Sequence, residues 1–167
     1  MLVAFDQLPD DSRLWVYQSD RTFSKSEIEF VSKSLTEFCE GWEAHGQPLA
    51  TSFKIEFDQF VILAVNENVY GASGCSIDGS VRVLKSIQNQ LGTDLLNRSV
   101  AFLMNDKVVL HSLSEAKVFL ANGTIHEDTF TFNNSVTSKK DFLQNWKIST
   151  KISPWLAKYL PKKALVQ

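Results

Sequence analysis

Residues 60–65, FVILAV, decide the fold, because every one of them is apolar. A strand with one face in water alternates apolar and polar residues, whereas an unbroken apolar run indicates a strand whose two faces are both covered. A run of this length is typical of a strand and is far too short to cross a bilayer. We therefore expect 60–65 to be a central strand with a packed layer on each side of its sheet.

The residues upstream predict two further strands. Residues 50–57 alternate between apolar and charged side chains, which is the pattern of a strand with one buried face. The alternating residues are Phe53, Ile55 and Phe57 with Lys54 and Glu56 between them. A tight turn at Asp58-Gln59 is expected to join this strand to 60–65. Residues 13–18, RLWVYQ, are aromatic and β-branched and predict another strand, preceded by an irregular arm.

A helix is expected between these two strands. Ser24 and Glu27 have the spacing of a capping box, and Phe23 and Ile28 have that of a hydrophobic staple. An apolar stripe then follows at helical spacing and consists of Ile28, Val31, Leu35, Phe38 and Trp42. We expect the helix to end near His45-Gly46, where glycine can take a left-handed cap.

Downstream, a loop over 66–77 leads to a second helix, which Gly92 ends. The apolar stripe of this helix consists of Val81, Leu84, Ile87 and Leu91. Residues 100–104 and 107–111 predict a hairpin around the turn Asn105-Asp106. Beyond it we expect a short helix to Ala121, a weak strand near 129–132 and one or two short helices.

The order β-α-β-β-α-β matches the ferredoxin-like, or split βαβ, arrangement of an α+β protein. We predict a single domain over 1–167, with a 13–112 core, an added strand and a helical C-terminal extension over 113–167. Right-handed crossovers place both helices on one face of the antiparallel sheet. The extension is expected to cover the other face, although a homodimer interface would serve equally well. Its covering residues would be Trp146, Trp155, Leu156 and Tyr159.

Composition favours a soluble cytoplasmic protein. The chain has 167 residues, of which 44% are hydrophobic, enough for a real core. It contains no bilayer-length apolar run, and its first residues, MLVAFDQLPDDSR, lack the basic start of a signal peptide. Its two cysteines, Cys39 and Cys75, form no CxxC pair, which indicates unpaired thiols in a reducing compartment. Cys39 lies on the stripe of the first helix and is expected in the core.

The stretch GASGCSID, residues 71–78, is the candidate site. The predicted strand order brings it to the same end of the sheet as residues 42–45 and the turn at 105–107. Cys75 would lie just before the second helix, where free N–H groups and the helix dipole favour a thiolate or a bound anion. The residues expected to bind the ligand are Trp42, Gly71, Ser73, Gly74, Ser76 and Asp78.

Two functions compete for this stretch. The first is a binding module for a small anion or a protein partner. The second is a cysteine-dependent enzyme of acyl-transfer or hydrolase type, in which Cys75 attacks and His45 moves the proton. The N–H groups of Ser76 and Ile77 would hold the oxyanion. Each residue also has a structural interpretation: a buried thiol for Cys75, a helix N-cap for Asp78 and a packing residue for Trp42.

Other patterns in the sequence indicate a function less specifically than residues 71–78 do. Ser19-Asp20-Arg21 could hold an anion but is more typical of a turn. The basic tail (residues 138–167) contains seven lysines and one acidic residue, so nucleic acid or a membrane surface is an alternative partner. Packing of its aromatics with its lysines in water is the more ordinary arrangement. His111 and His126 lack ligand spacing, and neither GxxxxGK[ST] nor GxGxxG occurs, so no metal site or cofactor is expected.

The segments RLWVYQSDR, WEAHGQPL and FVILAVNENVYGASGCSID resemble a family of small uncharacterised bacterial proteins often labelled ABC transporter ATPase. The resemblance covers about residues 13–112, and W-x-x-H-G and GASGCSID are its most specific marks. It implies no catalytic residue. A P-loop ATPase needs the phosphate-binding lysine motif that this sequence lacks, so we expect a protein that is not a P-loop ATPase.

Overall fold

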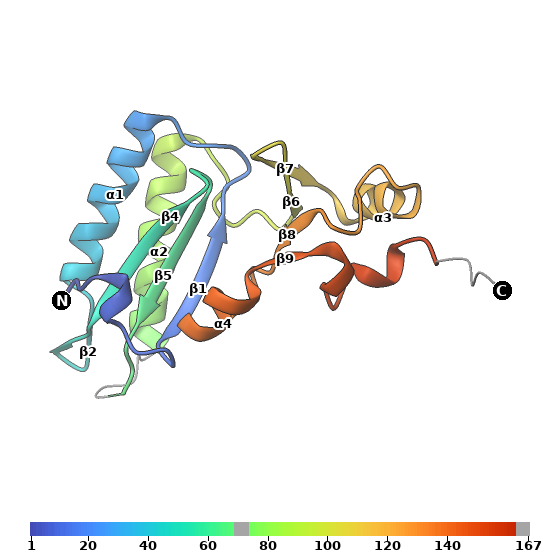
Figure 1. Ribbon diagram of the computed structural model, residues 1–167. Helices are drawn as coiled ribbons and strands as arrows, with labels where there is room; N and C mark the ends of the chain where they lie inside the picture. The colour runs from blue at the N-terminus through green and yellow to red at the C-terminus, as the bar shows by residue number, and fades with distance from the viewer. Residues whose placement is uncertain (69–73, 163–167) are drawn as a thin grey trace. The chain divides into compact units, whose positions relative to one another are not determined.

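The computed structural model of the protein describes residues 1–68 and 74–162, apart from the side chains of 74–77 (Figure 1). The structure is mixed α+β, as predicted, and divides into two compact units. The first unit consists of Met1–Asn97 and Asn134–Gln144, and the second of Arg98–Asn133 and Asn145–Gln167. These units do not follow the expected boundary at residue 112. That the whole chain acts as one domain stays a prediction.

The sheet of the first unit has the strand order β1-β5-β4, with β1 (Arg13–Gln18), β4 (Thr51–Glu56) and β5 (Phe60–Val65). Both neighbours run antiparallel to β5. Every side chain of β5 is fully buried, so the prediction of a central strand covered on both faces is confirmed. The turn that enters β5 lies one residue earlier than predicted, because Phe57 and Asp58 have the positive φ angles, 53° and 52°.

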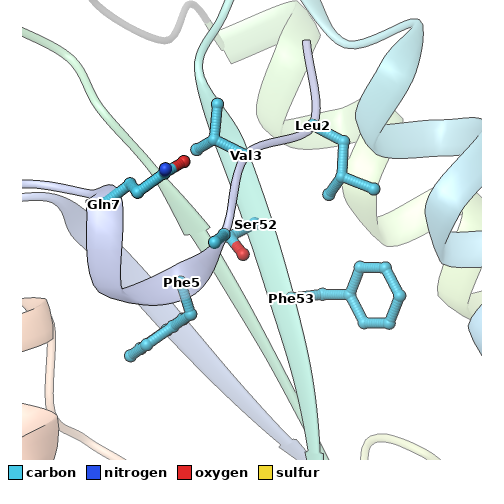
Figure 2. Close-up of a pocket in the computed structure, with 7 residues that line it drawn as sticks. Leu2, Val3, Phe5, Gln7, Ser52 and Phe53 are labelled. Atoms are coloured by element: carbon cyan, nitrogen blue, oxygen red, sulfur yellow. The ribbon is translucent and has the colours of Figure 1, made fainter.

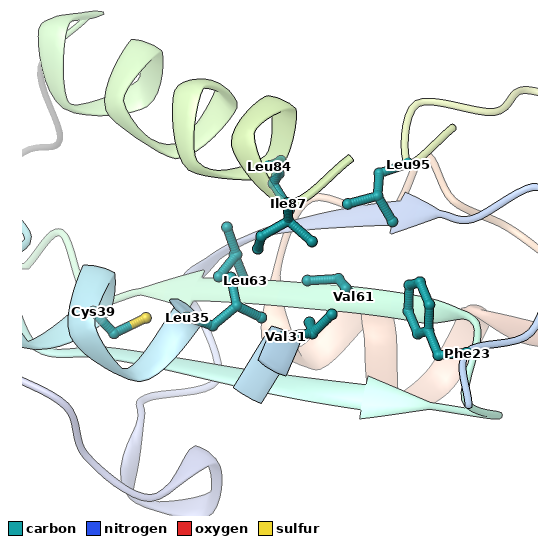
Figure 3. Packing of buried hydrophobic residues seen from close by; sticks show 9 residues of the cluster. All are labelled: Phe23, Val31, Leu35, Cys39, Val61, Leu63, Leu84, Ile87 and Leu95. Atoms are coloured by element: carbon teal, nitrogen blue, oxygen red, sulfur yellow. The ribbon is translucent and has the colours of Figure 1, made fainter. Parts of the chain in front are cut away.

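Two helices, α1 (Lys25–Glu40) and α2 (Gly74–Leu91), cover one face of this sheet, as the right-handed crossovers require (Figures 1 and 3). They meet it through a cluster of buried apolar residues. The cluster consists of Phe23, Val31, Leu35, Cys39, Val61, Leu63, Leu84, Ile87 and Leu95. Burial of each of the larger aliphatic side chains stabilises the fold by roughly 1.5–3 kcal/mol, and together they hold both helices on the sheet.

The start of α1 is fixed by the expected capping box. The Glu27 amide donates to the Ser24 hydroxyl at 3.3 Å, and the Ser24 amide donates to the Glu27 carboxylate at 2.8 Å. Arg21 adds a two-pronged contact to the same carboxylate, at 2.7 and 2.9 Å. Phe23 lies in the core cluster with Ile28 packed against that cluster, as a hydrophobic staple requires.

The end of α1 differs from the prediction. The helix stops at Glu40, and the chain then forms a short hairpin of β2 (Glu43–Ala44) and β3 (Gln47–Pro48). His45 and Gly46 are its two turn residues, with φ angles of 54° and 74°. A two-residue hairpin turn of this type needs positive φ at both positions, which Gly46 adopts without strain. The glycine therefore serves a hairpin and not a helix end.

The opposite face of the first sheet carries the 3-10 helix η1 (Phe5–Gln7) and α4 (Lys139–Asn145) (Figure 1). The rings of Phe5 and Phe142 meet edge to face with centroids 5.9 Å apart. Just before α4, the Leu14 amide of β1 donates to the Thr137 carbonyl at 2.9 Å. Residues 134–144 therefore help to complete the layer that the buried strand β5 requires.

The second unit contains the four-stranded sheet β7-β6-β8-β9. Its elements are β6 (Val100–Met104), β7 (Lys107–His111), α3 (Leu113–Ala121), β8 (Phe130–Phe132), β9 (Lys147–Ser149), η2 (Thr150–Ile152) and η3 (Ala157–Tyr159). The predicted turn at Asn105-Asp106 is confirmed, because both residues have positive φ and Met104 pairs with Lys107. Ser112 and Glu115 form a second capping box at the start of α3.

The sheets differ from the prediction in two respects. A ferredoxin-like order would place residues 100–104 beside β1, but β6 pairs with β7 and β8 in the other sheet. The aromatic residues assigned to the back face of the first sheet instead pack within the second unit. Trp155, Leu156 and Tyr159 join the cluster around Phe102. Trp146 packs on Phe132, with ring centroids 4.9 Å apart.

Candidate functional site

The backbone of α2 begins at Gly74, so the helix includes all of GCSID, residues 74–78, instead of following it. Cys75 and Ser76 lie in its first turn, and their side chains are outside the described part of the structure. Asp78 is exposed and lies inside the helix, so it is not the N-cap that we predicted. Gly71 and Ser73 lie outside the described residues.

The expected partner of Cys75 has a different setting from the one predicted. His45 is exposed at the tip of the β2–β3 hairpin, whereas we expected it at the end of α1. The strand β2 contacts α2. That residues 42–45 meet the stretch 71–78 stays a prediction. The turn at 105–106 belongs to the second unit. The pairing of His45 with the Cys75 thiol and the approach of that turn both stay predictions.

Trp42 forms the centre of a buried aromatic cluster at the base of the hairpin. Its ring centroid lies 4.7 Å from that of Phe38 and 6.0 Å from that of Trp15. Ala44, Leu49 and Val65 complete the cluster. The approach of α2 to this cluster is close, because a Cβ atom on Gly79 would lie 3.7 Å from the Phe38 ring.

The indole nitrogen of Trp42 is a buried donor. The residue is 3% exposed, and its Nε1 has no hydrogen-bond partner within the described part of the chain. A buried polar group without a partner is costly, and tryptophan N–H groups usually find an acceptor when buried. The cluster therefore offers one hydrogen bond to an acceptor that the described residues do not supply.

Cys39 is the core residue that the sequence predicted. It is fully buried on α1, and burial raises the pKa of its thiol to about 11, against the opposing effect of the Thr51 hydroxyl. The neutral, enclosed thiol is a poor nucleophile. Chemistry at a cysteine would have to use Cys75.

Ser19, Asp20 and Arg21 form a turn whose polar groups are used inside the protein. The Ser19 and Thr93 hydroxyls lie 2.7 Å apart, and the Thr93 hydroxyl donates to the Asp20 carboxylate at 2.6 Å. This hydrogen bond holds the pKa of Asp20 below its usual value. Arg21 pairs with Glu27 and donates to the Leu91 carbonyl at the end of α2. These contacts therefore favour a structural turn at residues 19–21 over an anion-binding site.

Two hollows are formed by described residues of the first unit. The larger, of about 560 Å³, lies between the N-terminal arm and β4 and is lined by Leu2, Val3, Ala4, Phe5, Gln7, Ser52 and Phe53 (Figure 2). The smaller, of about 240 Å³, lies between β1 and residues 134–137. Sequence reasoning missed the larger one, because it treated the first dozen residues as an irregular arm.

Several of the basic tail's lysines are engaged within the protein. Lys139 is buried, Lys151 pairs with Asp128, and Lys147 lies over the Phe130 ring. Within residues 1–68 and 74–162, no three His, Cys, Asp or Glu side chains gather as metal ligands would. None of the helices in that same part has the length and apolar character to cross a bilayer.

Comparison of the chain with family models, curated proteins and solved structures returned no match. The family resemblance therefore stays a prediction, and the site is argued from its own geometry.

Proposed function

We propose that this protein is a cytoplasmic binding module that takes a small anion, or an anionic group of a protein partner, at the start of α2 beside Trp42. The observation that carries the proposal is the buried indole N–H of Trp42, which has no acceptor among the described residues. A carboxylate or phosphate oxygen supplies such an acceptor. The aromatic cluster supplies a rigid apolar floor beneath it.

The backbone of α2 supports the same ligand class. A helix of 18 residues leaves the first four of its amide N–H groups without partners inside the helix, and its dipole adds partial positive charge there. The hairpin strand β2 contacts α2 and carries Trp42 at its base. The Trp42 donor and the helix amides would then act on one anion from two elements.

The test is an anion titration of the intact protein, read by tryptophan fluorescence and by calorimetry, with phosphate, sulfate and acetate as probes. We expect saturable binding of at least one probe and a loss of about tenfold or more in affinity in Trp42→Phe. Trp155→Phe, in the second unit, is the matched control and should bind as the wild type does. Equal binding by Trp42→Phe, or no binding of any probe, would contradict the proposal.

A cysteine-dependent enzyme is the second candidate, because Cys75 lies in the first turn of α2. A helix N-terminus is one of the settings that lower a thiol pKa. Since Cys39 is buried, iodoacetamide labelling of the native protein reports on Cys75, with Cys75→Ser as the blank. Labelling well below about pH 8.5 would support the enzyme. Labelling only above that range would exclude the enzyme in favour of the binding module.

Binding of nucleic acid or a membrane surface through the basic tail is a third candidate. Residues 138–162 supply α4, β9 and buried side chains to both units, so the tail is part of the fold. Salt-sensitive binding to DNA, RNA or anionic vesicles by the intact chain would revive this candidate.

The finer fold assignment is also a proposal. We infer that the first unit is a variant of the ferredoxin-like arrangement, in which residues 134–138 take the place of the fourth strand. Support comes from the antiparallel bridge between Arg13 and Ser138 on the outer edge of β1. An experimental structure in which this segment leaves β1 would overturn it.

A further inference from the structure

The strand β4 leaves part of its edge unpaired. It is an outer strand of its sheet. Among the described residues, only its first residue, Thr51, forms a bridge at that edge, to Leu2. The Thr51 amide donates to the Met1 carbonyl at 3.0 Å, and the Val3 amide donates to the Thr51 carbonyl at 2.9 Å. Because alternate residues of a strand point their peptide groups the same way, those of Phe53 and Ile55 face outward too.

Nothing described in the structure pairs with these outward groups. No backbone hydrogen bond reaches Phe53 or Ile55 from the arm, because the arm turns away after Ala4 into η1. The hollow of about 560 Å³ lies where the N-terminal arm, residues 1–7, diverges from β4 (Figure 2). An exposed strand edge of this kind is a template for another strand.

The charges beside this edge are self-complementary. Lys54 and Glu56 lie on the same face of β4, with the ammonium nitrogen 3.3 Å from the carboxylate. Both side chains are about one-third exposed, at 38% and 33%. A strand that carries one cation and one anion two residues apart can face an antiparallel copy of itself with opposite charges matched.

From this edge and its charges we infer that β4 pairs with β4 of a second copy of the chain, antiparallel and about a two-fold axis at Ile55. The two Ile55 residues then exchange backbone hydrogen bonds across the axis. Lys54 of each copy stands opposite Glu56 of the other. The three-stranded sheet becomes a continuous six-stranded sheet, in the manner of a symmetric homodimer.

The neighbouring registers are disfavoured. With the axis at Lys54, the two Lys54 ammonium groups would stand directly opposite each other. With the axis at Phe53, Ile55 would stand opposite Thr51 of the second copy, whose outward groups already bond to the arm. Only the register centred on Ile55 satisfies both the charges and the arm.

The overlap is short, so the dimer is of the weak, reversible kind. Its four paired charges are solvent-accessible, and salt therefore weakens the association. Sedimentation velocity of the intact protein over a concentration series, at low and at high ionic strength, is the primary measurement. We expect a monomer–dimer equilibrium that shifts toward monomer at high salt.

Charge exchange tests the register. Lys54→Glu alone and Glu56→Lys alone each place like charges opposite each other, and each should weaken dimerisation by about tenfold or more. An equimolar mixture of the two single variants should form heterodimers, because opposite charges then face across the axis. The double variant Lys54→Glu/Glu56→Lys should recover the wild-type association.

The mixture separates this interface from a loss of the Lys54–Glu56 pair within one chain, since neither single variant regains that internal pair. Far-ultraviolet circular dichroism checks that each variant is folded. If a single variant unfolds, the association of the double variant still tests the predicted register. A wild type that is monomeric at low salt would overturn the inference. A dimer unaffected by these substitutions, or a mixture that does not associate, would also overturn it.

Discussion

The basic tail is one segment by composition and two by structure. Its first part, which includes α4, belongs to the unit built around β5, whereas residues from 145 onward belong to the unit built around β6. Lys139 represents the first part and is 6% exposed. Lys151 represents the second part, and its side chain is 51% exposed and paired with Asp128. Similar lysines in one basic tail therefore have different physical roles.

Lys139 fastens the N-terminal arm from inside the protein. Its ammonium nitrogen donates to the Leu8 carbonyl at 2.6 Å and to the Asp6 carbonyl at 3.1 Å. Its backbone amide donates to the Ser12 carbonyl at 2.9 Å. A buried charge that donates to two main-chain carbonyls holds two distant parts of the chain together, and a surface pair does not. A local excess of lysine thus does not identify a binding surface.

The largest expected effects test the division of the tail. Phe142→Ala removes a buried ring from the first unit and should cost roughly 3–5 kcal/mol. Leu156→Ala empties a fully buried site in the second unit and should cost roughly 2–5 kcal/mol. Each unit contains two tryptophans, so tryptophan-to-phenylalanine backgrounds give each unit its own fluorescence signal in denaturant unfolding.

We expect Phe142→Ala to lower mainly the unfolding midpoint reported by Trp15 and Trp42. Leu156→Ala should lower mainly the midpoint reported by Trp146 and Trp155. Leu143→Ala is the matched control, because that side chain is 60% exposed. If Phe142→Ala destabilised only the second unit, the assignment of α4 to the first would be wrong.

Replacement of the two lysines comes next in size. Lys139→Met leaves the buried Leu8 carbonyl and the partly buried Asp6 carbonyl without their donor and should cost roughly 2–4 kcal/mol in urea unfolding. Lys151→Met removes an exposed ion pair, and its unfolding midpoint should stay close to that of the wild type. Comparable losses in the two variants would remove the contrast between the halves of the tail.

The two capping boxes provide a smaller, matched pair. Ser24→Ala in the first unit and Ser112→Ala in the second each remove the hydroxyl that accepts the N3 amide. Each should cost roughly 1 kcal/mol. Thermal unfolding with unit-specific fluorescence should show each loss in its own unit, and a loss seen in the other unit would count against the division.

The smallest effect is the pH dependence of the two cap glutamates. The hydrogen bonds from Arg21 and then from the Ser24 amide lower the pKa of Glu27 from 4.5 to about 2. The Ser112 amide and hydroxyl also lower the pKa of Glu115. Since each folded pKa is below the unfolded value, the stabilisation is present above about pH 4.5 and is lost as the pH falls.

For Glu27 this loss should extend from pH 4.5 down to about 2. Thermal melts over this range should therefore show a pH slope in the first unit that Glu27→Gln flattens. Glu115→Gln should leave that slope unchanged, because Glu115 lies in the second unit. An unaltered slope in Glu27→Gln would mean that other carboxylates carry it.

Short-range patterns predicted many of the elements. The strands 13–18, 60–65, 100–104 and 107–111 were placed with their observed bounds, because their signals are local: short apolar, aromatic or β-branched runs and the turn residues beside them. The failures arose where one residue type serves two structures. Gly46 suits both a helix end and a hairpin turn, and Asp78 suits both an N-cap and a helix interior. The Asp20–Thr93 hydrogen bond had no local signal, because its partners are 73 residues apart.

By itself, the sequence determined that β5 is buried on both faces, because an unbroken apolar strand is stable only between two layers. It also determined the start of α1, because a capping box is complete within four residues. Only the tertiary structure decided which segment supplies the second layer, which sheet receives β6 and which lysine is buried. Those outcomes depend on contacts between residues far apart in the chain, where several apolar segments could satisfy the same face and packing selects one of them.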